Sequence, residues 1–147
     1  MNIRDWSSDV CSSDLLELFP RGAQSYVALS GFSNARPDHA QRAVGFALEA
    51  LEALKRIQSR SGTGFTVQIG VDSGVVIGGV SSDQRFIYNI WGPVVQTAQE
   101  ISTGVEGDSV VITDRVQRAV HEFFEFELLD DGNWIVFARA ASDERAN

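Results

Sequence analysis

The residues best suited to chemistry lie between Phe86 and Glu100, in the segment Phe-Ile-Tyr-Asn-Ile-Trp-Gly-Pro-Val-Val-Gln-Thr-Ala-Gln-Glu. It combines the amides of Asn89 and Gln96 with the indole ring of Trp91 and the carboxylate of Glu100. Amides both donate and accept hydrogen bonds, so these side chains could hold a polar ligand. In the competing interpretation, the amides are solvated, Glu100 is a surface charge and Trp91 anchors a core or an interface. Residue types alone leave both interpretations open.

Other reactive or metal-binding side chains give weaker signals. His39 and His121 fall on separate predicted helices and the single cysteine is Cys11, so a zinc or copper site is not predicted. Asp72 belongs to a turn and Asp38 to a helix start, which favours turn and capping roles over catalysis. The glycine-rich stretch in the middle of the chain lacks the Gly-Lys-Ser/Thr of a P-loop. Close backbone packing in a strand pair and at a dimer seam explains its glycines better.

The composition excludes several classes of function. The chain has 147 residues, 44% of them hydrophobic, and a formal net charge of −8. This length suits one domain with a modest core, and a negative charge without any basic run argues against binding to nucleic acid or an anionic membrane. No apolar run approaches the ~20 residues of a membrane span, and no signal peptide is visible. One cysteine allows no internal disulfide, so we expect a cytoplasmic domain, either free or part of a larger protein.

The first fifteen residues differ from the rest of the chain. Residues 1–15 are rich in serine and aspartate, repeat Ser-Ser-Asp and show no helical or strand period. They resemble a translated sequencing-adapter read-through; an ordinary flexible tail is the alternative. We therefore expect a disordered or non-native tail over 1–15, one domain over 16–140 and a disordered tail over 141–147.

The elements that would position the polar side chains alternate between strands and helices. The strongest is a helix over 38–57, where an apolar stripe follows a capping-box arrangement of Asp38 and Gln41. Two further helices are expected, over 94–102 after Pro93 and over 114–123 after a Thr113 cap. Strands are expected in hairpins over 16–31, 65–80 and 124–138, as a third strand over 86–90 and as a buried strand over 110–112. The order predicts an α+β fold with a mostly antiparallel sheet covered by helices.

Four short motifs follow one another along this chain: Ala23–Gly31, Arg36–Ala40, Ile69–Val80 and Tyr88–Glu100. Each is a weak signal alone, but their order and spacing over about 18–126 resemble those of the class III adenylate/guanylate cyclase catalytic domain, or cyclase homology domain. The resemblance implies the ferredoxin-like cyclase fold within the α+β class.

The resemblance also implies a metal site that this chain does not complete. In the family, two aspartates hold two metal ions, Mg²⁺ or Mn²⁺, on the triphosphate. The first would lie upstream of the matching residues, so we expect the chain to be N-terminally truncated relative to the family. The second corresponds to Gln24, whose neutral amide is a poor ligand for Mg²⁺. We therefore expect that this chain does not bind the metals.

The same resemblance assigns the polar residues around Trp91 to the nucleotide. Asn89 stands for a base-reading aspartate, Gln96 for a ribose-orienting asparagine and Glu100 for the arginine that stabilises the phosphates. A base-reading lysine would fall near Pro20. The predicted nucleotide-binding residues are Asn89, Trp91 and Gln96, and the degenerate catalytic positions are Gln96 and Glu100. Asn89 can still accept a hydrogen bond from an exocyclic amine, whereas losing one preorganised phosphate donor typically costs ~3 kcal/mol.

Three functions are open at this point. The family reaction converts ATP or GTP to a cyclic nucleotide and diphosphate in intracellular signalling, and we expect this degenerate chain to be inactive in it. A nucleotide-binding or dimerisation module of a larger signalling protein, paired as a homodimer or with another cyclase domain, is the second function. An unrelated ferredoxin-like interaction domain is the third. Preference for ATP or GTP cannot be predicted, because both specificity positions have changed.

Two structural features distinguish these functions. A cyclase domain should place the predicted 67–80 hairpin beside the 86–90 strand in one sheet. A domain that pairs should also expose an apolar surface near Trp91 or the hairpin glycines.

Overall fold

The computed structural model describes residues 17–20, 25–31, 37–62, 64–82 and 85–140, and gives the backbone alone for 17–20, 79–82 and 85–89. Its helices are α2 (His39–Ser61), α3 (Pro93–Ser102) and α4 (Asp114–Val120). Its strands are β1 (Glu17–Pro20), β2 (Tyr26–Leu29), β3 (Gln68–Val71), β4 (Ile77–Ser82), β5 (Arg85–Trp91), β6 (Ser109–Ile112), β7 (Phe124–Leu128) and β8 (Trp134–Arg139). The predicted tails over 1–15 and 141–147 lie outside the described residues.

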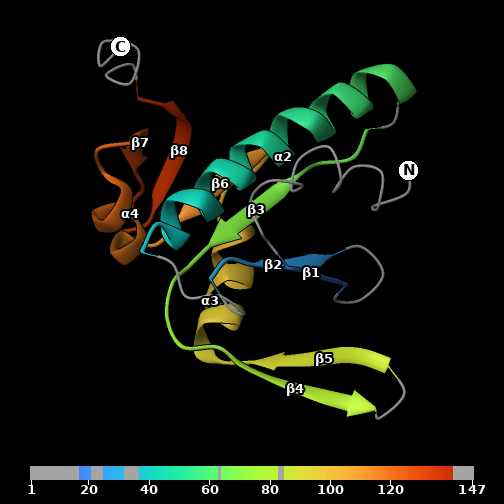
Figure 1. Cartoon of the computed structure of the whole chain (residues 1–147). Coiled ribbons are helices and arrows are strands. Elements are labelled where there is room, and N and C mark those ends of the chain that lie inside the picture. The colour runs from blue at the N-terminus through green and yellow to red at the C-terminus, as the bar shows by residue number, and fades with distance from the viewer. Residues whose placement is uncertain (1–16, 21–24, 32–36, 63, 83–84, 141–147) are drawn as a thin grey trace.

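The centre of the molecule is a four-stranded sheet in the order β3-β6-β8-β7. Strand β3 runs parallel to β6, while β8 runs antiparallel to both β6 and β7. All four residues of β6 are buried, as the apolar run over 110–112 predicted. Helix α2 covers one face of this sheet (Figure 1). The core contains residues of α2, α4 and the sheet: Ala40, Val44, Ala47, Val110, Ile112, Val116, Val120, Phe124 and Val136.

Helix α3 lies on the opposite side of β3 from α2 (Figure 1). Side chains alternate between the two faces of a strand. Ile69 and Val71 of β3 pack against the core that α2 covers, whereas a Cβ added at Gly70 would meet the backbone of Ala98 in α3. The two helices therefore hold β3 between them, and α3 is tied to the core sheet.

Two hairpins form separate two-stranded sheets. In the first, β1 pairs antiparallel with β2, as the 16–31 hairpin predicted. In the second, β4 pairs antiparallel with β5, so that Ile77 lies opposite Trp91 and Gly79 lies opposite Asn89. We call the β4–β5 hairpin the arm, because it projects away from the four-stranded sheet (Figure 1). Four of the five strand pairings are antiparallel, which confirms the predicted α+β fold.

The predicted hairpin over 65–80 is wrong. Strand β3 pairs with β6 in the central sheet, whereas β4 pairs with β5 in the arm, so residues 72–76 cross from one sheet to the other. A strand of alternating apolar and polar residues followed by a glycine turn is compatible with β3 pairing either with β4 or with another strand. Its observed parallel partner, β6, lies some forty residues further along the chain. The expected strand order holds only for β4 beside β5, so the family has to be decided on other grounds.

Two predicted caps are also wrong in their contacts. Asp38 and Thr113 stand at the N-caps of α2 and α4, but neither side chain forms a cap hydrogen bond. The Asp38 carboxylate instead accepts a hydrogen bond from the Nε of Arg42 at 2.8 Å, and the Thr113 hydroxyl donates one to Asp72.

The ends of two helices also differ from the prediction. Helix α2 runs four residues beyond the predicted Ile57, and α4 ends at Val120, three residues before the predicted end.

Candidate functional site

Three of the predicted site residues lie on β5 and α3, which meet at a corner. Gly92 forms the corner with a φ of 147°, and an added Cβ would lie 2.8 Å from the carbonyl oxygen of Val75. Pro93 then begins α3, where its missing N–H costs no helical hydrogen bond. Val95 is buried. The first turn of α3 is therefore held against the crossover of residues 72–76 and the core.

The outer side of α3 presents Gln96 and Glu100 to solvent. They lie one turn apart, and the Nε2 of Gln96 donates a hydrogen bond to the Oε1 of Glu100 at 2.9 Å. The arrangement presents an anionic carboxylate on this face, and one donor of the Gln96 amide is already used by Glu100. Such a pair suits a cationic or neutral hydrogen-bonding group better than a phosphate.

Trp91 begins an apolar surface on the arm. Trp91 is 52% exposed, and Ile77, its partner across the arm, is 62% exposed. Val75, two residues before Ile77, is 78% exposed. The predicted exposed apolar surface near Trp91 is thus confirmed, and we call these three residues the arm surface.

Two predicted site residues cannot be placed in the site. Gln24 lies outside the described residues. Asn89 pairs through its backbone with Gly79 in the arm, but its side chain lies outside the described part of the structure. The structure therefore brings together Gln96 and Glu100 on α3, with Trp91 at the end of the preceding strand, and the nucleotide role of all five residues stays a prediction.

Sequence reasoning missed a polar cluster around Asp72. Its side chain is fully buried and accepts two hydrogen bonds from Arg115, from Nε to Oδ1 at 2.7 Å and from the second guanidinium nitrogen to Oδ2 at 2.6 Å. The Thr113 hydroxyl donates to Oδ1 at 2.7 Å, and the N–H of Ser73 donates at 2.8 Å. We call Asp72, Ser73, Thr113 and Arg115 the Asp72 cluster. It ties the start of the crossover to the start of α4.

Electrostatics favour the ionised form of Asp72. Burial alone would raise the pKa of its carboxyl, but the hydrogen bonds from Arg115, Thr113 and the Ser73 N–H together outweigh it and lower the pKa. The same pairing raises the pKa of Arg115. No sequence signal marked this pair, because its members are 43 residues apart and each has an ordinary local role.

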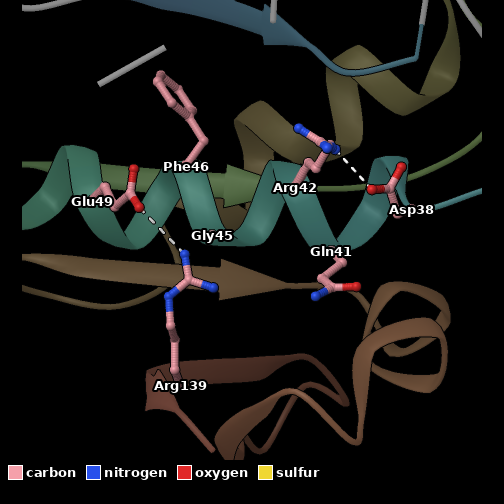
Figure 2. A pocket seen from close by; sticks show the side chains of 7 residues that line it. All are labelled: Asp38, Gln41, Arg42, Gly45, Phe46, Glu49 and Arg139. Carbon is pink, nitrogen blue, oxygen red and sulfur yellow. Dashed lines mark hydrogen bonds and ion pairs between the residues drawn. The ribbon is translucent and has the colours of Figure 1, made fainter. Parts of the chain in front are cut away.

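A polar hollow of about 220 Å³ lies elsewhere, between α2 and the end of β8 (Figure 2). Two ion pairs line it: Arg42 with Asp38 at 2.8 Å, and Arg139 with Glu49 at 3.4 Å. These two cations and two anions balance. The hollow contains none of the predicted site residues, so we do not treat it as the functional site.

The expectation that this chain does not bind the family's metal ions stays a prediction. No group of three or more His, Cys, Asp or Glu side chains in the described ranges is placed to hold a metal ion. Gln24, at the predicted metal position, offers only a neutral amide.

A family model, "Adenylate and Guanylate cyclase catalytic domain", matches residues 22–142. The chain belongs to this family. Domains of the family generally use Mg²⁺ or Mn²⁺. The match covers all four motifs and all five predicted site residues of this cyclase domain.

Curated relatives of the cyclase domain are longer proteins. An "Adenylate cyclase" of Mycobacterium tuberculosis is 28% identical over 109 residues, which cover 74% of this chain and 25% of the relative. A "Guanylyl cyclase, membrane" of Dictyostelium discoideum is also 28% identical over 109 residues, 7% of its length. The cyclase domain thus spans a quarter or less of these two relatives. Within its described residues, none of the helices has the length and apolar character to cross a bilayer.

Solved structures share the fold of the cyclase domain. The guanylate cyclase domain of RhGC from Catenaria anguillulae, solved with GTP, aligns with a TM-score of 0.82 at 24% identity, over 94% of this chain and 81% of that one. A non-canonical dimeric guanylyl cyclase domain of the RhoGC fusion protein from Blastocladiella emersonii aligns with a TM-score of 0.84 at 22% identity, over 94% of this chain and 78% of that one. At these identities the likeness concerns the fold.

Proposed function

We propose that this cyclase homology domain keeps the scaffold of a nucleotide cyclase but does not convert ATP or GTP to a cyclic nucleotide, and that it acts as a pairing module in a signalling protein. The observation that carries the proposal is the Gln96–Glu100 hydrogen bond on the exposed side of α3. By the family resemblance, these positions belong to the groups that orient the ribose and neutralise the phosphates.

The charge at position 100 argues against turnover. A cyclase must stabilise negative charge on the triphosphate as the ribose hydroxyl attacks, and preorganised cations supply most of that stabilisation. Glu100 places an anion there, with its Oε1 hydrogen-bonded to Gln96. Coulomb's law gives about 1 kcal/mol for two unit charges about 4 Å apart in water, so reversing the expected charge weakens the contact with one phosphate charge by about 2 kcal/mol.

The donor set supports the same conclusion. Two metal ions that bridge the phosphates need carboxylate oxygen, and Gln24 replaces the one metal aspartate whose position this chain includes. Gln24 therefore cannot supply one of these carboxylates, and Glu100 cannot supply the phosphate cation.

The pairing role rests on the arm surface. Val75, Ile77 and Trp91 are each more than half exposed, and Ile77 and Trp91 are partners across the arm. Exposed apolar groups that cluster mark interaction sites. We propose a second copy, or a related cyclase domain, as the partner. The solved relatives include a dimeric and a monomeric guanylyl cyclase domain.

Turnover is tested directly with purified protein, Mn²⁺ and ATP or GTP. We expect no cyclic nucleotide above a blank without protein. Sedimentation of the same sample should show concentration-dependent pairing that Trp91→Asp abolishes. Cyclic nucleotide formation would instead assign the family reaction to this chain, and a particle that stays monomeric at high concentration would remove the pairing role.

A further inference from the structure

The crossover of residues 72–76 is the part of the chain that leads from the core sheet into the arm. Its first residue, Asp72, has a fully buried side chain that joins it to Arg115 and Thr113 at the start of α4. A buried carboxylate held by a two-point contact from arginine has a fixed direction as well as a favourable energy. The crossover therefore leaves β3 along a defined path.

The next residues of the crossover pack on the corner that precedes α3. A Cβ added at Gly74 would lie 2.5 Å from the Cγ2 of Val94, and one added at Gly92 would lie 2.8 Å from the carbonyl oxygen of Val75. These approaches are possible only because both positions are glycine. Any shift of the crossover is therefore passed to the first turn of α3 and to Trp91, which directly precedes Gly92.

We infer that Asp72 and Arg115 are a positioning pair that sets the placement of the arm surface and of the outer side of α3 relative to the core. The pair acts on them through the Gly74–Val94 and Val75–Gly92 contacts. The effect of the pair on function rests on the proposed pairing role. Its effect on the position of the arm surface does not depend on that role.

The contacts of Asp72 predict an order of effects among its variants. Asp72→Asn keeps an oxygen that can accept from Thr113 and Ser73, but loses the charge that holds both guanidinium contacts. Asp72→Ala removes every acceptor. Arg115→Lys keeps the positive charge but not the planar two-point contact. Trp91 should therefore be displaced further in Asp72→Ala than in Asp72→Asn, and it should also be displaced in Arg115→Lys.

The test uses ¹⁹F NMR of the full chain labelled with 5-fluorotryptophan, with the Trp91 resonance assigned by its loss in Trp91→Phe. We expect the Trp91 resonance to shift in Asp72→Asn and to shift further or broaden in Asp72→Ala, at unchanged far-UV circular dichroism. The control is Glu49→Gln, which removes the charge of a second ion pair between distant elements, Arg139–Glu49, and should leave Trp91 unmoved.

A Trp91 resonance at its wild-type position in a folded Asp72→Asn protein would overturn the inference and leave the pair a purely stabilising contact. If Asp72→Ala does not fold, Asp72→Asn and Arg115→Lys carry the test. Sedimentation of the same variants separates the two proposals. A moved resonance in a chain whose wild type never pairs would refute the pairing role and support the positioning role.

Discussion

The contact between Gly70 and α3 predicts that alanine at this position destabilises the domain strongly. A Cβ added at Gly70 would lie 1.9 Å from the carbonyl oxygen of Ala98 and 3.0 Å from the Cγ1 of Ile101. The first neighbour is backbone in the middle of a helix, so no side-chain rotation can relieve the overlap. Helix α3 must move away from β3, and the corner that carries Trp91 must move with it.

The distances give the size of the effect. Real Cβ atoms essentially never lie closer than 3.0 Å to such an atom, and 3.0 Å less 1.9 Å leaves a displacement of about 1.1 Å. Overpacking of this kind typically costs about 1–3 kcal/mol, and the involvement of backbone places Gly70→Ala at the upper end. For a chain of this length, about 3 kcal/mol corresponds to a fall in Tm of roughly 6–12 °C.

Urea unfolding followed by circular dichroism measures this cost, with Gly64→Ala as the matched control. No atom lies within 4 Å of the Cβ position at Gly64, and its backbone φ is an ordinary one. Alanine there should be neutral or stabilise by about 0.4–1 kcal/mol, because it restricts the unfolded chain. If Gly70→Ala unfolds within about 0.5 kcal/mol of the wild type, α3 does not lie on β3 as described.

Three further predictions concern stability. Ser109→Ala should stabilise the domain by about 1 kcal/mol in urea unfolding, because the buried Ser109 hydroxyl has no hydrogen-bond partner among the described residues; a loss of stability would reveal a missed partner. Gly45→Ala should cost less than about 1 kcal/mol, since the atoms nearest to its Cβ belong to the flexible end of Arg139, at 2.9 Å, and the helix gains propensity; a larger loss would show that Arg139 cannot move. The pKa of Asp72 is lowered in the folded state. The stability that its pair with Arg115 contributes should therefore be fully present above about pH 5 and be lost as the pH falls through the folded pKa. In Asp72→Asn, this part of the pH dependence of the unfolding free energy should disappear.

Local pattern predicted most of the elements. The apolar stripe of α2 and Pro93 at the start of α3 each specify their structure within a few residues, as does the tight turn of the predicted 124–138 hairpin. Gly132 has the positive φ of 89° that such a turn favours. These features depend on neighbours in sequence, which a single chain displays in full.

The remainder depends on partners that are distant in sequence. Strand β3 could pair with β4 or with β6, and the choice is made by the burial of β6 between α2 and α3. The side chain of Asp38 pairs with Arg42 and that of Thr113 hydrogen-bonds to Asp72, and both contacts compete with helix capping. Asp72 was assigned to a turn, since nothing near it in sequence reveals Arg115.

The most direct test of the central claim is the affinity for a non-hydrolysable triphosphate analogue before and after Glu100→Arg. The matched control is Glu52→Arg, the same charge change at an exposed position on α2. Restoring a cation where the family places one should raise the affinity more than tenfold, by about 2 kcal/mol, while the control changes it little. Equal effects of the two variants, or none, would contradict the assignment of the outer side of α3 to the remnant of a nucleotide site.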